Sequence, residues 1–108
     1  HGFHIHENGS CDNAGNGAGG HFNPNNVKHG KLIVDGFDQA HAGDLGNILV
    51  AADGHGTLSQ TVPGLTLSDG LYAIASRAVI LHAQRDDFSQ PVGNAGARIG
   101  CGTIDLVY

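Results

Sequence analysis

The stretch HGFHIHENGSCD, residues 1–12, decides how the rest of this chain is interpreted. Three histidines and a cysteine occupy positions 1, 4, 6 and 11. Phe3 and Ile5 alternate with His4 and His6, and side chains on a strand alternate between its two faces. We therefore predict a strand with both imidazoles on one face, about 7 Å apart. Such a pair can bind one metal ion, although a polar outer strand face explains a lone His-x-His equally well.

The composition favours a small β-rich domain. The chain has 108 residues, which corresponds to one domain, and only 14% of them are charged. Its 18 glycines argue against a helical bundle, because glycine is costly inside helices. Gly, Asn and Asp separate short apolar segments, as expected for strands and turns. DGHG at 53–56 predicts a hairpin turn. The predicted strand segments are LGNILVAA, GTLSQTV, YAIASRAVILHA and GCGTIDLVY.

Charge and hydropathy exclude two classes of partner. The net charge is −5 with only five lysines and arginines, so there is no basic stripe to bind nucleic acid. No segment is long and apolar enough to cross a bilayer. The chain begins with neither a methionine nor a signal peptide, which indicates a mature form or a fragment.

A long polar stretch, from residue 8 to about residue 43, contains further candidate metal ligands. His21 and His29 lie within it, and His41 and Asp44 lie at its end. A loop of this length in a small domain needs an explanation, and a bound ion can order it. Three histidines and one aspartate form a plausible four-coordinate zinc set. The alternative is a polar surface loop that contains histidines without binding metal.

Two further features stay ambiguous when they are considered alone. His82 closes the apolar run RAVILH, and a histidine there is more often a hydrogen-bonded core residue than a ligand. Cys11 and Cys101 permit one internal disulfide or two free thiols.

Taken together and in order, these motifs resemble the copper-zinc superoxide dismutase family. The match spans residues 1 to about 104 and is carried by HGFHIHE, GGHFNP, KHG, HAGDLGN, ILHA, DD and GNAGARIGCG. The resemblance implies an all-β fold, a Greek-key sandwich or flattened barrel with long metal-binding loops. It also implies a single partial domain over 1–108 that lacks the first three strands of the barrel.

The resemblance assigns roles to particular residues. The copper ligands are His4, His6, His21 and His82, and the zinc ligands are His21, His29, His41 and Asp44. Catalysis involves Arg98 beside the copper channel and His21, which is shared by both metals. Asp86 links a copper-bound and a zinc-bound histidine, His4 and His29, and Cys11 and Cys101 form the family disulfide.

The chemistry of these side chains suits the implied roles. Imidazole binds both copper and zinc, whereas a carboxylate suits zinc better than reduced copper. A shared imidazole such as His21 can leave one metal and take up a proton. A carboxylate behind the ligands, such as Asp86, orients histidines and tunes their basicity. The guanidinium of Arg98 is always charged and can orient a small anion such as superoxide.

The implied function is the conversion of superoxide to dioxygen and hydrogen peroxide. Two alternatives are a copper carrier and a structural zinc-stapled domain. The short spacing from His6 to Cys11 is similar to the bacterial branch, so we predict a periplasmic or secreted protein, where a disulfide persists. A homodimer is one open possibility for its oligomeric state.

Overall fold

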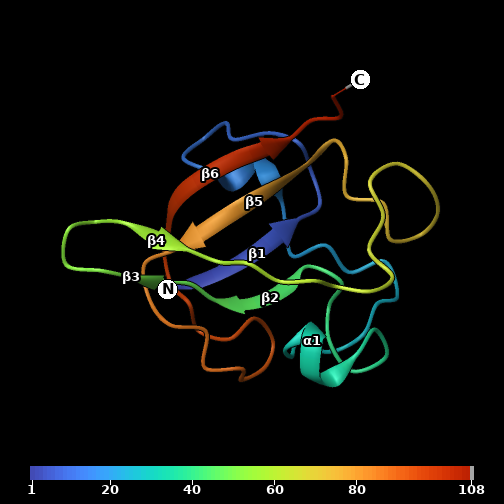
Figure 1. The fold of residues 1–108 in the computed structure, drawn as a ribbon, viewed down its shortest axis with the longest axis horizontal. Helices are drawn as coiled ribbons and strands as arrows, with labels where there is room; N and C mark the ends of the chain where they lie inside the picture. The colour runs from blue at the N-terminus through green and yellow to red at the C-terminus, as the bar shows by residue number, and fades with distance from the viewer. Residues whose placement is uncertain (108) are drawn as a thin grey trace.

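A four-stranded antiparallel sheet organises the structure, a computed structural model that describes residues 1–107 (Figure 1). Its strands follow the order β2-β1-β5-β6, so that β1 pairs with the distant β5 as well as with β2. Such non-sequential antiparallel pairing is typical of Greek-key folds. The sheet strands are β1 (Gly2–His6), β2 (Asp44–Asn47), β5 (Arg77–His82) and β6 (Arg98–Ile104).

The alternation in β1 is as predicted. His4 pairs with Ile80, and His6 pairs with Ala78 of the same strand β5. Paired residues of an antiparallel sheet share one face, so both histidines lie beside the fully buried Ile80. Ile5 points to the opposite face. The pairing of His4, Ile5 and His6 with β5 thus places the two imidazoles on one face of the sheet and the Ile5 side chain on the other.

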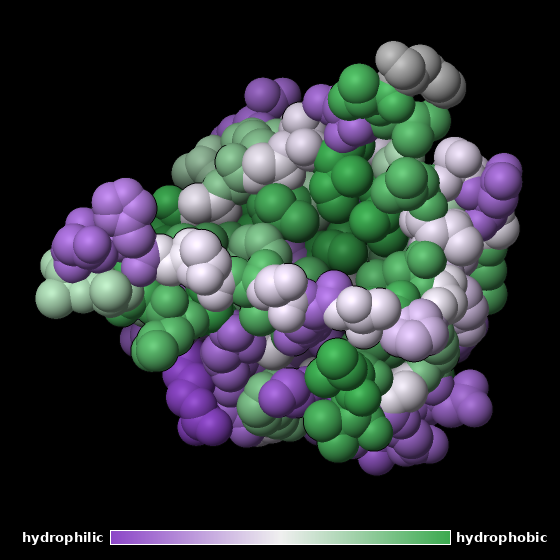
Figure 2. Space-filling view, viewed as in Figure 1, coloured by the Kyte–Doolittle hydropathy of each residue, from purple (hydrophilic) through white to green (hydrophobic). Residues whose placement is uncertain are grey.

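The two faces of the sheet are covered differently. The histidine face packs Ala78 and Ile80 against Ala18, the last residue of the 3-10 helix η1 (Asn16–Ala18). The opposite face carries the main apolar cluster around Ile5. There the chain that leaves β4 (Gly56–Thr57) runs across the sheet (Figure 1). Apolar residues gather beside this crossing segment (Figure 2). The cluster consists of Ile5, Phe22 and Ala42 with the partly buried Phe37, Leu45, Leu65, Tyr72, Ile74, Val79 and Ile104.

The predicted hairpin turn is confirmed. Strand β3 (Leu49–Val50) pairs antiparallel with β4, and residues 51–55 connect them. Within the turn, the Gly54 N–H donates to the Ala51 carbonyl and the Ala51 N–H donates to the His55 carbonyl. Gly54 has a φ of 89°, a left-handed conformation in which glycine carries no steric penalty.

All four predicted strand segments differ from the structure in their bounds. LGNILVAA is divided into β2 and β3, which belong to different sheets. The segment GTLSQTV is a strand only at Gly56–Thr57, because the following residues cross the sheet face instead of extending an edge. YAIASRAVILHA becomes a strand only at Arg77. GCGTIDLVY pairs as far as Ile104, and its last residue lies outside the described residues.

One short helix was not predicted. Helix α1 (Leu32–Asp35) has four residues and buries Leu32, while Gly36 ends it with a φ of 78°. Within residues 1–107, no helix combines the length and apolar character needed to cross a membrane.

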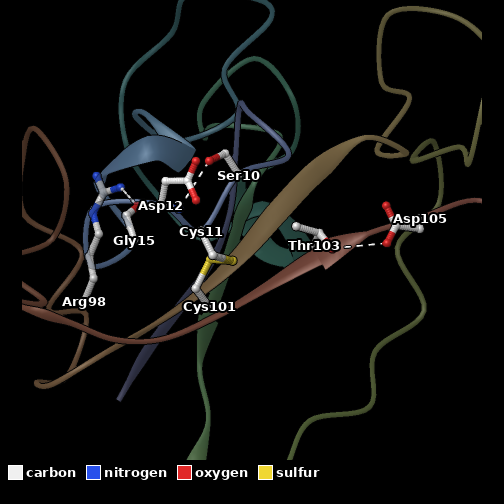
Figure 3. Close-up of a disulfide and its surroundings, with 8 residues drawn as sticks. All are labelled: Ser10, Cys11, Asp12, Gly15, Arg98, Cys101, Thr103 and Asp105. Atoms are coloured by element: carbon white, nitrogen blue, oxygen red, sulfur yellow. Dashed lines mark hydrogen bonds between the residues drawn. A yellow bond between two sulfur atoms is a disulfide. The ribbon is translucent and has the colours of Figure 1, made fainter.

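A disulfide joins the long loop to the last strand (Figure 3). Cys11 and Cys101 are 90 positions apart, and their Cα atoms lie 5.8 Å apart. Cys101 lies in β6, and the loop that carries Cys11 also carries Gly15. The bond therefore attaches a segment with few apolar side chains to the sheet, close to Arg98.

Removal of this disulfide should destabilise the fold. The variant Cys101→Ser opens a loop of about ninety residues, and we expect its free energy of unfolding to fall by about 2–5 kcal/mol. Urea unfolding of the metal-free protein measures the change. Ser10→Ala, in the same loop, is the control and should stay within about 1 kcal/mol of wild type. Equal urea midpoints for wild type and Cys101→Ser would contradict the expectation.

Candidate metal centre

Six histidines and two aspartates from distant parts of the chain meet on one side of the sheet. β1 contributes His4 and His6, and β5 contributes His82 at its end. His21 forms an isolated antiparallel bridge with His6, so its backbone is aligned beside β1. Every metal ligand predicted from the sequence falls into one of two buried groups: His4, His6, His21 and His82, and His21, His29, His41 and Asp44.

Backbone carbonyls fix the orientation of two rings in the first group. The His6 Nδ1–H donates to the Gly19 carbonyl over 2.8 Å, and the His82 Nδ1–H donates to the Gly96 carbonyl over 3.0 Å. A ring that donates from Nδ1 keeps a lone pair on Nε2 when it is neutral. Both Nε2 atoms are therefore available as metal ligands.

Three imidazole nitrogens of this group are buried without a hydrogen-bond partner. His4 donates from Nε2 to Asp86 over 2.7 Å, which leaves its Nδ1 free. The Nε2 atoms of His6 and His82 are likewise unpartnered. Buried polar atoms without partners are rare in folded proteins, and each needs an explanation. The ligand atoms of the group lie within 4.8 Å of one another, so one ion can satisfy all three nitrogens.

The second group is centred on one carboxylate oxygen. Asp44 Oδ1 lies 3.0 Å from Nδ1 of His21 and of His29, and 3.1 Å from Nδ1 of His41. Its other oxygen, Oδ2, accepts the backbone N–H groups of Gly30 and His41 over 2.9 and 2.8 Å. These two hydrogen bonds hold the carboxylate with Oδ1 toward the three rings.

Both donor sets fit the metals that the sequence predicts for them. Four ligands at zinc-bond lengths in a tetrahedron are about 3.3 Å from one another, close to the 3.0–3.1 Å between Asp44 Oδ1 and the three nitrogens. Three histidines and a carboxylate are common zinc ligands. The other group offers four imidazoles and no carboxylate, a set that suits copper in both oxidation states.

Asp86 connects the two groups from behind. Its carboxylate accepts from Nε2 of His4 over 2.7 Å and from Nε2 of His29 over 2.9 Å. The side-chain amide of Asn47 pairs with the Asp86 backbone: the Asp86 N–H donates to Oδ1 over 2.7 Å, and Nδ2 donates to the carbonyl over 3.0 Å. The structure therefore places Asp86 between the two histidines that the sequence analysis named. The contact with Asn47 was not predicted.

Gly93 packs against Asp86 and has no room for a side chain. A Cβ atom at this position would overlap the Asp86 carboxylate and lie 2.7 Å from Nε2 of His29. Its φ of 82° also favours glycine. The first residue of the motif GNAG must therefore be glycine, because Asp86 and His29 occupy the space that a side chain would need.

A hollow of about 530 Å³ leads to the first group. Arg98 lines it together with His6, His21 and His82, and its Nη1 donates to the Gly15 carbonyl over 2.8 Å. The hydrogen bond to the disulfide-bonded loop holds the guanidinium in place (Figure 3). The remaining lining residues are Gly20, Gln84, Val92, Asn94, Ala95 and Gly96.

Burial keeps the rings of the first group neutral. It lowers the pKa of His6 to about 3, with nearby His21 and Arg98 acting in the same direction. It lowers the pKa of His21 to about 4, against the opposing effect of the Asp44 hydrogen bond. Burial likewise lowers the pKa of His4 and His82. Neutral rings keep the lone pairs that metal binding requires.

The carboxylates have the opposite effect on His29. Burial acts to lower its pKa, but the interactions of the ring with the carboxylates of Asp44 and Asp86 prevail and raise it to about 9. The pKa of each aspartate is held well below its usual range: burial acts to raise it, and hydrogen bonds from the histidines outweigh that effect. Metal binding at His29 must therefore displace a proton.

The metal-free protein should lose stability as the pH falls from about 6.5 to about 5. In this range the unfolded chain protonates His6 and His21, whereas the folded protein does not, so acid favours unfolding. Each ring contributes up to about 1.4 kcal/mol per pH unit. His29 adds no slope here, because it is protonated in both states below pH 6.5. Urea unfolding across this range measures the slope, and a flat profile would contradict the assignment of neutral buried rings.

Comparison with known proteins places the chain in a family. The family model for copper/zinc superoxide dismutase (SODC) matches residues 1–104. The chain is 45% identical to "Superoxide dismutase [Cu-Zn] 2" of Mesembryanthemum crystallinum over 98% of its own length and 70% of that protein. It is 42% identical to "Extracellular superoxide dismutase [Cu-Zn]" of Caenorhabditis elegans, with coverage of 99% and 50%.

A solved structure resembles the fold as well. The clock protein EA4 superposes with a TM-score of 0.86 at 34% identity, over 98% of this chain and 69% of that one. The chain thus spans between half and about 70% of the length of these relatives. The family match extends over the histidine strand, both metal groups, the disulfide and the arginine strand, and this chain belongs to the copper/zinc superoxide dismutase family.

Proposed function

We propose that this protein converts superoxide to dioxygen and hydrogen peroxide. The observation that carries the proposal is the position of His21, which belongs to both buried groups and also lines the hollow. The first group contains only histidines (His4, His6, His21 and His82) and is called the all-histidine group below. Copper in this group would supply the one-electron couple that oxidises one superoxide and reduces the next. Zinc would occupy the group that contains Asp44, as its tetrahedral spacing supports.

His21 is suited to hold and deliver a proton. Its Nδ1 faces Asp44 and His41 over 3.0 and 3.1 Å, so its Nε2 is the atom left for the all-histidine group. Because the ring lines the hollow, a proton on Nε2 would face an incoming small anion. Reduction of superoxide to peroxide consumes protons, and a positioned imidazole is the usual donor at neutral pH.

Arg98 is suited to attract and orient the substrate. Its guanidinium is charged at any working pH and is tied to the Gly15 carbonyl, so it presents its remaining N–H groups from a fixed position. Of the residues of the described chain that line the hollow, Arg98 alone carries a permanent charge. A single cation that lines an otherwise neutral hollow favours a small anion.

The disulfide supports a location outside the reducing cytosol. We propose a secreted or periplasmic protein, because a structural disulfide persists in oxidising compartments. The nematode relative carries the word extracellular in its name. The bacterial type and the homodimer named in the sequence analysis stay predictions.

The variant His82→Ala separates the enzyme from a zinc-stapled structural domain. It removes one nitrogen of the all-histidine group and none of the Asp44 group. We expect copper binding to weaken at least tenfold and dismutation to fall with it, while bound zinc stays at one ion per chain. Metal analysis and the decay of a superoxide pulse measure both quantities. Unchanged copper content and activity would favour the structural alternative.

The variant Arg98→Ala tests substrate orientation without touching the metal groups. We expect the dismutation rate to fall by about tenfold or more, because a fixed cation near the reacting anion is lost. Copper and zinc contents should stay at wild-type levels. The matched control is Arg85→Ala, an exposed arginine that does not line the hollow. A rate for Arg98→Ala equal to that of the control would contradict this role.

A further inference from the structure

We propose that Gln90 is a positioning residue that fixes the main chain of His29 and joins the Asp44 group to the wall of the hollow. The inference rests on the proposed function, because it takes zinc as the ion of that group. Gln90 belongs to the short turn between Asp86 and Gly93, outside the residues that the family resemblance assigned.

Gln90 pairs with both backbone groups of His29. The His29 N–H donates to Gln90 Oε1 over 2.9 Å, and Gln90 Nε2 donates to the His29 carbonyl over 2.7 Å. Residues 27–30 belong to no helix or strand, so His29 has no strand neighbour to satisfy these groups. The amide side chain takes the place of such a neighbour from 61 positions away.

Each nitrogen of the His29 ring faces a carboxylate, and the Nδ1 is buried without a hydrogen-bond partner, so a shift of the backbone changes both contacts. Its Nδ1 lies 3.0 Å from Asp44 Oδ1, and its Nε2 donates to Asp86 over 2.9 Å. The side chain is fully buried. A main-chain displacement at His29 cannot be absorbed by rotating the ring without losing one of these partners. The position of the main chain therefore decides where Nδ1 stands in the zinc group.

The turn that carries Gln90 is braced by its own hydrogen bonds. The Asp87 N–H donates to the Gly93 carbonyl over 2.9 Å, and the Gly93 N–H donates to the Ser89 carbonyl over 2.8 Å. Ser89 donates to the Asp87 carboxylate from both its N–H and its hydroxyl. The turn thus behaves as one unit, and Gln90 is its attachment to the chain at His29.

The same turn continues into the wall of the hollow. Val92, Asn94, Ala95 and Gly96 line it, and the Gly96 carbonyl accepts the Nδ1–H of His82. Through Gln90, the backbone that orients a ring of the all-histidine group is joined to the backbone of a ring in the zinc group. Asn47 holds the Asp86 backbone by the same reciprocal pairing, so one amide supports each end of the hydrogen bond between His29 and Asp86.

The expected effect of losing Gln90 is moderate. Gln90 is exposed as a residue, so water can replace part of its hydrogen bonding to His29. Residues that orient metal ligands from behind typically alter metal affinity by tenfold or more. Because water compensates in part, we expect Gln90→Met to release zinc about three- to tenfold faster than wild type.

The experiment compares Gln90→Met with Gln39→Met in protein loaded with copper and zinc. Methionine keeps the length of the side chain and loses both hydrogen bonds. Gln39 is exposed and, like Gln90, lines the hollow beside His29, which has a volume of about 480 Å³. Transfer of zinc to an excess of a chromogenic chelator gives the release rate, and copper release is followed in parallel. Cobalt in the zinc group provides an absorption spectrum that reports its coordination.

Faster zinc release and an altered cobalt spectrum in Gln90→Met alone, with copper release unchanged, support the inference. Gln90→Glu keeps an acceptor for the His29 N–H, and its release rate should fall between wild type and Gln90→Met. If Gln90→Met does not fold, zinc release from Gln90→Glu is compared with that from wild type and Gln39→Met instead. Wild-type zinc release from both Gln90 variants overturns the inference. Equal acceleration of zinc and copper release also overturns it, because that result indicates general destabilisation. Absence of zinc from this group in the loaded wild type defeats the proposed function itself, before any variant is compared.

Discussion

The structure depends on one constraint: two buried groups of metal ligands share the imidazole of His21. Each group by itself leaves buried polar atoms that need a cation. One presents buried nitrogens without partners, and the other gathers three rings around a single oxygen of Asp44. A ring common to both must present opposite edges to the two groups. This requirement fixes the place of the loop that carries His21, which the bridge to His6 aligns beside β1.

The sheet and the loops solve this problem in different ways. In β1 and β5 the side-chain period and the strand register place His4, His6 and His82 directly. His4 and His6 occupy buried positions beside Ile80. The loops have few apolar side chains with which to do the same. They rely on polar attachments across long sequence distances: the disulfide at Cys11 and the amide pairings of Asn47 and Gln90.

This division explains how much the sequence alone could predict. The alternation at His4 and His6 and the hairpin at 53–56 follow from local rules, and both are present. The grouping of the ligands came from motif order, not from periodicity, because His29 and His82 lie in unrelated segments. Asn47 and Gln90 carried no local signal, since their partners are 39 and 61 residues away. GTLSQTV alternates like a strand, yet Leu58 and Val62 line a hollow with Phe3 across the sheet face.

The charge arrangement indicates why the zinc group contains the carboxylate. Asp44 and Asp86 both contact His29 and raise its pKa to about 9, so without metal a proton on this ring balances part of their charge. The rings of the other group have no such support, and burial keeps them neutral. A divalent ion in the Asp44 group that displaces this proton can balance the charge of both carboxylates. The rings of the all-histidine group instead stay neutral. A change in the charge of their ion therefore changes the electrostatic potential at His21 and at any anion beside Arg98.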